Sequence, residues 1–194
     1  MIVESKWSEY MKTSINFVFL VALMLGAGYA RAADPSAVRA MLQPARQRKP
    51  APAFVLTDVA GKKVKLFDYH GRVLLLNFWA TECGGCRLEI PYFIEFAQEF
   101  THKDVAVVGV SVDILYENLR DSNEGWGRVE PFVHTHKVNY PILMCDDPVT
   151  KLYGVSALPA TYLIDKKGRI AATYLGLVDK NDVEKNIKTL LINP

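Results

Sequence analysis

The chain has 194 residues, of which 50% are apolar and 23% are charged, and its formal net charge is +2. This length predicts one domain with tails, and the apolar content excludes a disordered chain. The small charge, with no basic cluster interleaved with aromatic residues, argues against a nucleic-acid partner. Three cysteines are too few for a disulfide-rich secreted scaffold.

Residues 1–32 have the pattern of a secretory signal peptide. An unbroken apolar run over residues 17–25 is followed by small residues and an Ala-Arg-Ala sequence, which predicts cleavage after Ala32. Two acidic residues among the first ten are atypical of such a signal, so Met11 is a candidate for the true start. The alternative is an uncleaved membrane anchor, but the run is shorter than the roughly 20 apolar residues that a span needs. We therefore expect an exported, periplasmic protein with no stable membrane span.

Residues 33–51 are rich in proline and carry no sustained hydrophobic period. Because proline removes backbone donors, this stretch predicts a flexible tether, with at most a short helical turn.

Residues 52–194 alternate predicted strands and helices. In chain order, we predict a hairpin (54–57 and 62–66), a buried strand (73–79), a helix through 88–100, a strand (105–112), a helical stretch from about 114, a loop (121–131), a helix near 132–137, a strand (140–144), a short helix (147–153), a hairpin (161–165 and 170–175) and a final helix (179–191). This order predicts an α/β domain, with a central mixed sheet flanked by helices.

Cys83 and Cys86 stand where the predicted strand 73–79 passes into a helix. A thiolate is the nucleophile in disulfide exchange, and a helix N-terminus stabilises an anion through its free N–H groups and partial positive charge. The spacing brings both sulfurs within bonding reach, and the intervening glycines impose no steric cost on closing the pair. We therefore expect a redox-active pair in which Cys83 attacks a substrate disulfide and Cys86 resolves the mixed disulfide.

Two other uses of the pair are an inert structural disulfide and half of a zinc site. Zinc requires four ligands, and only Cys145, His134 and His136 are available to complete the set. We expect no metal and no other cofactor, Cys145 as a buried free thiol, and both histidines exposed to solvent.

Two segments resemble the TlpA/ResA-type exported thioredoxins: LLNFWATECGGCRLEIP at residues 75–91 and ALPATYLID at residues 157–165. The resemblance covers about residues 52–191. It implies a thioredoxin fold with an N-terminal hairpin and a central insertion.

The resemblance also implies roles for residues around the cysteines. Pro159 matches the family's cis-proline, beside which the backbone of Leu158 would meet a bound chain. Glu89 matches an active-site acid and becomes the candidate to move protons to Cys86, because Asn77 replaces the buried aspartate of ordinary thioredoxins. The plainer alternatives are a strand-edge proline and an exposed helix glutamate. Trp79 and Glu82 complete the predicted substrate-binding set.

Glu82 also departs from the family pattern, which has tryptophan at this position, and Gly84-Gly85 replaces a proline-containing pair. A carboxylate about 4 Å from Cys83 in a high-dielectric environment opposes ionisation by about 1 kcal/mol. The helix terminus favours ionisation by about 0.3–1 kcal/mol. The two effects nearly cancel, so the thiol pKa stays open.

The sequence thus predicts a periplasmic thiol-disulfide oxidoreductase that reduces protein disulfides. From the resemblance alone we add a place in cytochrome c maturation and a membrane electron donor of the disulfide-reductase type. Protein thiols and disulfides are the expected partners. A copper-binding chaperone of thioredoxin fold is one alternative, although no histidine lies near the pair in sequence. A peroxiredoxin is another, but it needs a threonine three residues before the reactive cysteine, and Thr81 stands two before Cys83.

Overall fold

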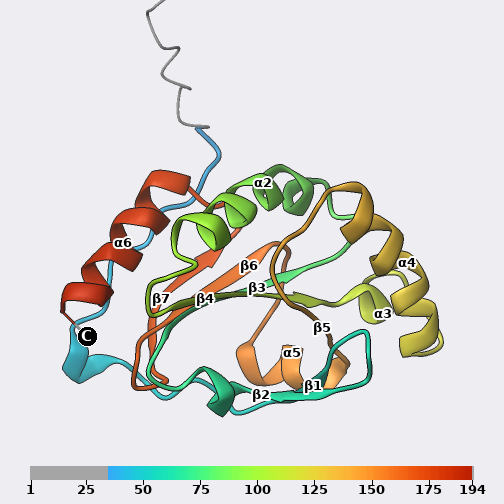
Figure 1. Ribbon diagram of the computed structural model, residues 1–194, viewed down its shortest axis with the longest axis horizontal. Helices are drawn as coiled ribbons and strands as arrows, with labels where there is room; N and C mark the ends of the chain where they lie inside the picture. The colour runs from blue at the N-terminus through green and yellow to red at the C-terminus, as the bar shows by residue number, and fades with distance from the viewer. Residues whose placement is uncertain (1–34, 194) are drawn as a thin grey trace, which may run out of the picture. The chain divides into compact units, whose positions relative to one another are not determined.

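The computed structural model describes residues 35–193, which form a seven-stranded mixed sheet with helices on both faces (Figure 1). The predicted signal peptide lies outside the described residues. In chain order the elements are η1 (Ala45–Gln47), β1 (Val55–Thr57), β2 (Lys63–Lys65), η2 (Leu66–Tyr69), β3 (Val73–Trp79), α2 (Gly84–Glu99), β4 (Val105–Ser111), α3 (Asp113–Tyr116), α4 (Ser122–Thr135), β5 (Ile142–Met144), α5 (Asp147–Tyr153), β6 (Ala160–Ile164), β7 (Ile170–Leu175) and α6 (Lys180–Ile192).

β3 lies inside the sheet, whose strand order is β2-β1-β5-β4-β3-β6-β7. It pairs in parallel with β4 and antiparallel with β6, and all seven of its residues are buried. An apolar run, here broken only by Asn77, is typical of a strand covered on both faces, so the prediction for residues 73–79 is confirmed. The chain therefore leaves the interior of the sheet at Trp79, directly before the cysteine pair.

The helices form two layers around this sheet. Figure 1 shows α2 and α6 over one face and α5 over the other. The Asp179 side chain caps α6 by accepting hydrogen bonds from the backbone N–H groups of Asn181 and Asp182. The predicted hairpins are present as β1–β2 and β6–β7, and α3 and α4 form an insertion between β4 and β5. The predicted mixed sheet flanked by helices is therefore confirmed.

The predicted loop over residues 121–131 is wrong, because α4 covers most of it. Asp121 begins this helix: its side chain accepts hydrogen bonds from the N–H groups of Asn123 and Glu124. Two glycines indicated a loop, but Gly125 serves packing instead. A Cβ at this position would lie 2.9 Å from the Met144 sulfur, so any larger residue would require neighbouring side chains to shift where α4 approaches β5.

The segment predicted as a flexible tether over residues 33–51 is, from residue 35 onward, part of the folded domain. Val38 pairs with Val178 and Pro50 with Arg169 through isolated β-bridges, and the Arg39 guanidinium binds the Asp179 carboxylate at 2.7 Å. The missed signal is an alternation of period two, since the side chains of Val38, Ala40 and Leu42 pack against the core while residues 39 and 41 are exposed. The proline content concealed this short strand-like pattern.

Within residues 35–193, no helix has both the length and the apolar character that crossing a bilayer demands.

Alanine substitutions at the two glycines of α4 test the close approach of this helix to β5. Gly127→Ala should raise the free energy of unfolding by about 0.5–1 kcal/mol, because alanine favours a helix and nothing lies within 4 Å of the added Cβ. Gly125→Ala should lower the free energy of unfolding, because the buried Met144 and the half-buried Ile114 side chains must move. Urea denaturation measures both, and equal stabilisation by the two substitutions would contradict this packing.

Candidate active site

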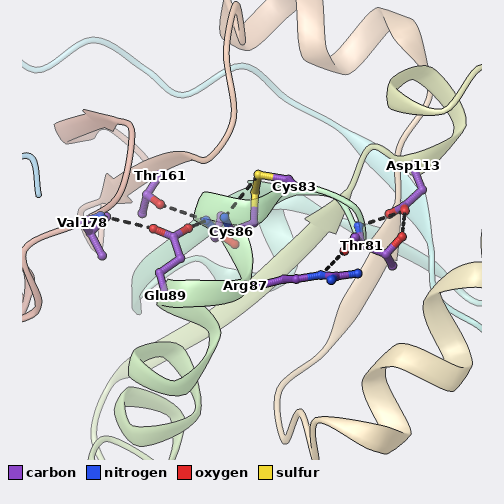
Figure 2. The surroundings of a disulfide bond; sticks show 9 residues. Thr81, Cys83, Cys86, Arg87, Glu89, Asp113, Thr161 and Val178 are labelled. Atoms are coloured by element: carbon purple, nitrogen blue, oxygen red, sulfur yellow. Dashed lines mark hydrogen bonds between the residues drawn. A yellow bond between two sulfur atoms is a disulfide. The ribbon is translucent and has the colours of Figure 1, made fainter. Parts of the chain in front are cut away.

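Cys83 is the N-cap residue of α2, and a disulfide bond joins it to Cys86 with a Cα–Cα distance of 5.3 Å (Figure 2). The Cys83 sulfur accepts a hydrogen bond from the Cys86 N–H at 3.2 Å. Cys83 is 4% exposed and Cys86 is fully buried, so Cys83 is the sulfur nearer to solvent. The strand-to-helix junction thus places one sulfur where helix N–H groups stabilise a thiolate.

Glu89 is a buried carboxyl group, not an exposed helix glutamate. It follows Cys86 by three residues, so the two side chains share one face of α2. Its Oε1 accepts a hydrogen bond from Asn77 Nδ2 at 2.7 Å, and its Oε2 accepts one from the Val178 N–H at 3.3 Å. Asn77 also donates to Thr161 Oγ1 at 3.0 Å, which ties the carboxyl group to β3, β6 and the segment before α6.

Burial is the dominant influence on the Glu89 carboxyl group and raises its pKa from the ordinary 4.5 to about 8. The hydrogen bonds from Val178 and Asn77 oppose this rise because they stabilise the ionised form. A carboxyl group with a pKa near 8 can take up and release protons near neutral pH, close to the ordinary thiol pKa of about 8.5.

Glu82 is exposed beside Cys83, and its charge is partly balanced. Its Oε1 lies 3.0 Å from Nη2 of Arg87, in an ion pair with side chains 59% and 46% exposed. The repulsion expected between Glu82 and a Cys83 thiolate is therefore reduced by a neighbouring positive charge. Glu82 thus places a charged, exposed side chain directly before the cysteine pair.

Pro159 lies against the cysteine helix, and the Leu158–Pro159 peptide bond is cis, which confirms the predicted geometry. A Cβ added at Gly85 would lie 3.3 Å from Pro159 Cδ, whereas one added at Gly84 would meet nothing within 4 Å. Neither glycine has a positive φ, so conformational freedom does not require them. Pro159 is buried and Leu158 is half-buried beside the pair.

Trp79 does not line the surface around the cysteines, which corrects its assignment to substrate binding. The indole is 1% exposed and packs against Phe132 of α4 with a centroid distance of 5.2 Å. Trp79 is the last residue of β3, a strand that is buried along its whole length, and its side chain is therefore part of the core.

Asp113 and Arg87, which no sequence pattern singled out, both bind Thr81 just before the cysteine pair (Figure 2). Asp113 is fully buried and accepts a hydrogen bond from the Thr81 N–H at 3.0 Å. Asp113 could have been found from its place in the sequence, because it follows the predicted strand 105–112. In a parallel pair, the residues after this strand lie at the same edge of the sheet as Cys83, which follows β3.

The other candidate ligands lie elsewhere. His134 and His136 are exposed as predicted, and the His136 ring stacks on Phe132. Cys145 is a buried free thiol, also as predicted, and burial raises its pKa to about 12. Among residues 35–193, no three His, Cys, Asp or Glu side chains gather to hold a metal ion.

Comparison with known proteins agrees with this geometry. Residues 48–173 match the AhpC/TSA family. The chain is 33% identical over 141 residues to the thiol-disulfide oxidoreductase ResA of Geobacillus thermodenitrificans, covering 72% of this chain and 75% of the relative. It is 34% identical over 137 residues to the thioredoxin-like protein YneN of Bacillus subtilis, covering 71% and 76%.

A solved structure from Chlorobium tepidum is also similar. It is a thiol:disulfide interchange protein of the thioredoxin family, with a TM-score of 0.63 and 25% identity, covering 75% of this chain and 97% of that one. The thioredoxin fold implied by the sequence motifs is therefore confirmed.

The burial of Glu89 makes the stability of the protein depend on pH. Between about pH 4.5 and 8 the folded state keeps a proton on Glu89 that the unfolded state has lost, so the free energy of unfolding falls as the pH rises. Glu89→Gln removes this dependence. Its stability relative to the parent should therefore grow with pH, by on the order of 1.4 kcal/mol per pH unit within that window.

Urea denaturation of the oxidised proteins at several pH values measures this difference. Glu130→Gln, which changes an exposed carboxylate on α4, is the matched control and should show no such trend. A Glu89→Gln difference that stays constant from pH 5 to pH 8 would contradict a proton held on Glu89.

Proposed function

Because the chain belongs to the AhpC/TSA family and is a thiol-disulfide oxidoreductase of the TlpA/ResA type, we propose that it reduces disulfide bonds of exported proteins, with Cys83 as attacking and Cys86 as resolving sulfur. One observation carries this assignment. The less buried sulfur occupies the N-cap of α2, and the fully buried one shares a helix face with a carboxyl group whose pKa is near 8.

In the first step the Cys83 thiolate attacks one sulfur of a substrate disulfide. A mixed disulfide forms between Cys83 and the substrate, and the second substrate sulfur leaves as a thiolate that takes a proton from solvent. The Cys86 N–H and the N-terminus of α2 favour the attacking thiolate, because both stabilise negative charge on the Cys83 sulfur.

In the second step Cys86 resolves the mixed disulfide. The Cys86 thiol gives its proton to Glu89 in its ionised form, which is the minor form near neutral pH because the pKa is about 8, and the resulting thiolate attacks the Cys83 sulfur. The remaining substrate sulfur leaves, and the Cys83–Cys86 disulfide forms. The substrate thus gains two electrons. Proton transfer to Glu89 is nearly balanced in energy because its pKa of about 8 lies close to that of an ordinary thiol.

The bound chain would lie across the surface formed by Glu82, Leu158 and Pro159, next to the sulfur pair. The half-buried Leu158 and the cis-proline beside Gly85 support this placement.

A dithiol donor must then reduce the Cys83–Cys86 disulfide, and we assign this role to a membrane electron donor of the disulfide-reductase type. The signal-peptide pattern of residues 1–32 supports a periplasmic location for the mature chain. Cytochrome c maturation is the pathway that we propose, on the basis of the resemblance to the TlpA/ResA type.

Trapping of mixed disulfides tests the two cysteine roles. Cys86→Ser leaves Cys83 able to attack but removes the resolving sulfur, so this variant should accumulate mixed disulfides with periplasmic proteins. Cys83→Ser should accumulate none, because Cys86 is fully buried. Non-reducing gel electrophoresis after acid quenching measures both, with Cys145→Ser as a control that should behave like the parent. Equal trapping by Cys83→Ser and Cys86→Ser would contradict the assigned order of attack.

A further inference from the structure

Thr81 is bound on both sides of its backbone by charged side chains from other parts of the chain. Its N–H and its hydroxyl group both donate to Asp113 Oδ1, at 3.0 and 2.5 Å. Its carbonyl oxygen accepts from Arg87 Nε at 2.6 Å. Figure 2 shows both side chains converging on Thr81 beside the disulfide. Because Thr81 stands two residues before Cys83, these contacts fix the chain just ahead of the attacking sulfur.

Asp113 is itself held firmly in place. It is fully buried, and its Oδ2 accepts a hydrogen bond from Ser111 Oγ at 2.7 Å. Ser111 ends β4 and pairs in register with Trp79, the last residue of β3. The parallel pairing of two buried strands therefore sets the position of this carboxylate relative to Thr81.

Arg87 connects the same loop to the first turns of α2. Its own N–H donates to the Cys83 carbonyl oxygen at 3.2 Å, while its guanidinium group lies 5.7 Å from the centre of the Phe132 ring and pairs with Glu82. Phe132 belongs to α4, so the guanidinium group contacts both the cysteine loop and the insertion helix.

We propose that Asp113 and Arg87 are positioning residues for disulfide exchange: they hold Thr81 and thereby keep the Cys83 sulfur at the N-terminus of α2. This inference rests on the proposed role of Cys83 as the attacking sulfur. Attack on a disulfide requires a defined direction of approach, and a misplacement of about 1 Å can slow a reaction by about a hundredfold. Without the two contacts, Cys83 would leave the N-cap position and lose the stabilising Cys86 N–H.

A purely structural role for Asp113 would predict that its removal only destabilises the fold. Asp165 provides the comparison, because it is also a buried carboxylate that accepts backbone hydrogen bonds, from the N–H groups of Lys167 and Arg169. Unlike Asp113, it also pairs with the guanidinium groups of Arg48 and Arg169, so its removal should destabilise the fold strongly. It follows Ile164, which pairs with Leu74 near the start of β3, whereas Cys83 follows the opposite end of that strand.

The test uses Cys86→Ser as the parent, so that Cys83 is the only accessible thiol. The rate constant for attack of Cys83 on an aromatic disulfide such as dithiobis-nitrobenzoate is measured against pH, which separates the thiol pKa from intrinsic reactivity. Asp113→Ala should slow attack at neutral pH by about tenfold and raise the Cys83 pKa. Asp113→Asn should react like the parent, because an amide oxygen still accepts from both Thr81 donors.

Asp165→Ala should lower the melting temperature but leave the rate constant and the thiol pKa unchanged. Arg87→Ala removes a side chain that is 46% exposed, leaves no buried charge, and should also slow attack; it carries the test if Asp113→Ala does not fold. The inference is overturned if a folded Asp113→Ala variant reacts at the parent's rate. If Asp113→Ala does not fold, reaction of Arg87→Ala at the parent's rate overturns it. Slowing by Asp165→Ala equal to that by Asp113→Ala would also overturn it. A parent in which Cys83 itself does not react would instead overturn the proposed function.

Discussion

A carboxyl group buried under the first turns of α2 is the constraint on which the site depends. Glu89 is fully buried, and it receives its hydrogen bonds from a side chain of β3 and from the backbone ahead of α6. Burying an ionised carboxylate costs free energy, so the group is held largely protonated near neutral pH. The buried Glu89 carboxyl group lies on the same face of α2 as Cys86.

The second determinant is the junction that places Cys83. A strand buried along its whole length ends at Trp79, and α2 begins at Gly84, so Cys83, the proposed attacking residue, becomes the helix cap. Asp113 and Arg87 bind the short connection from either side at Thr81. The less buried sulfur thus caps the helix, while the fully buried Cys86 shares a helix face with the Glu89 carboxyl group.

Some of this arrangement could be predicted because its signals are local. The apolar run of β3, the hairpins, α5 and the cap of α6 depend on residues close in sequence, and the cysteine spacing marks the reactive pair. The sequence did not indicate the first turns of α4, because Gly125 lies in close contact with Met144 inside a helix rather than in a turn. The burial of Glu89 could not be derived from periodicity, because it requires Val178 from a segment 89 residues away. The contacts of Thr81 with Asp113 likewise join residues that follow two different strands, and they form only once β3 and β4 pair.

Direct titration of the Glu89 carboxyl group is the measurement closest to the central claim. Carbon-13 NMR of protein labelled at its glutamate carboxyl groups, with Glu89→Gln to assign the resonance, gives the titration midpoint in the folded oxidised protein. The structure predicts a midpoint near pH 8. A midpoint at the ordinary glutamate value of about 4.3 would contradict it, because transfer of a proton to such a carboxylate from a thiol with a pKa of about 8.5 is unfavourable by about four pKa units.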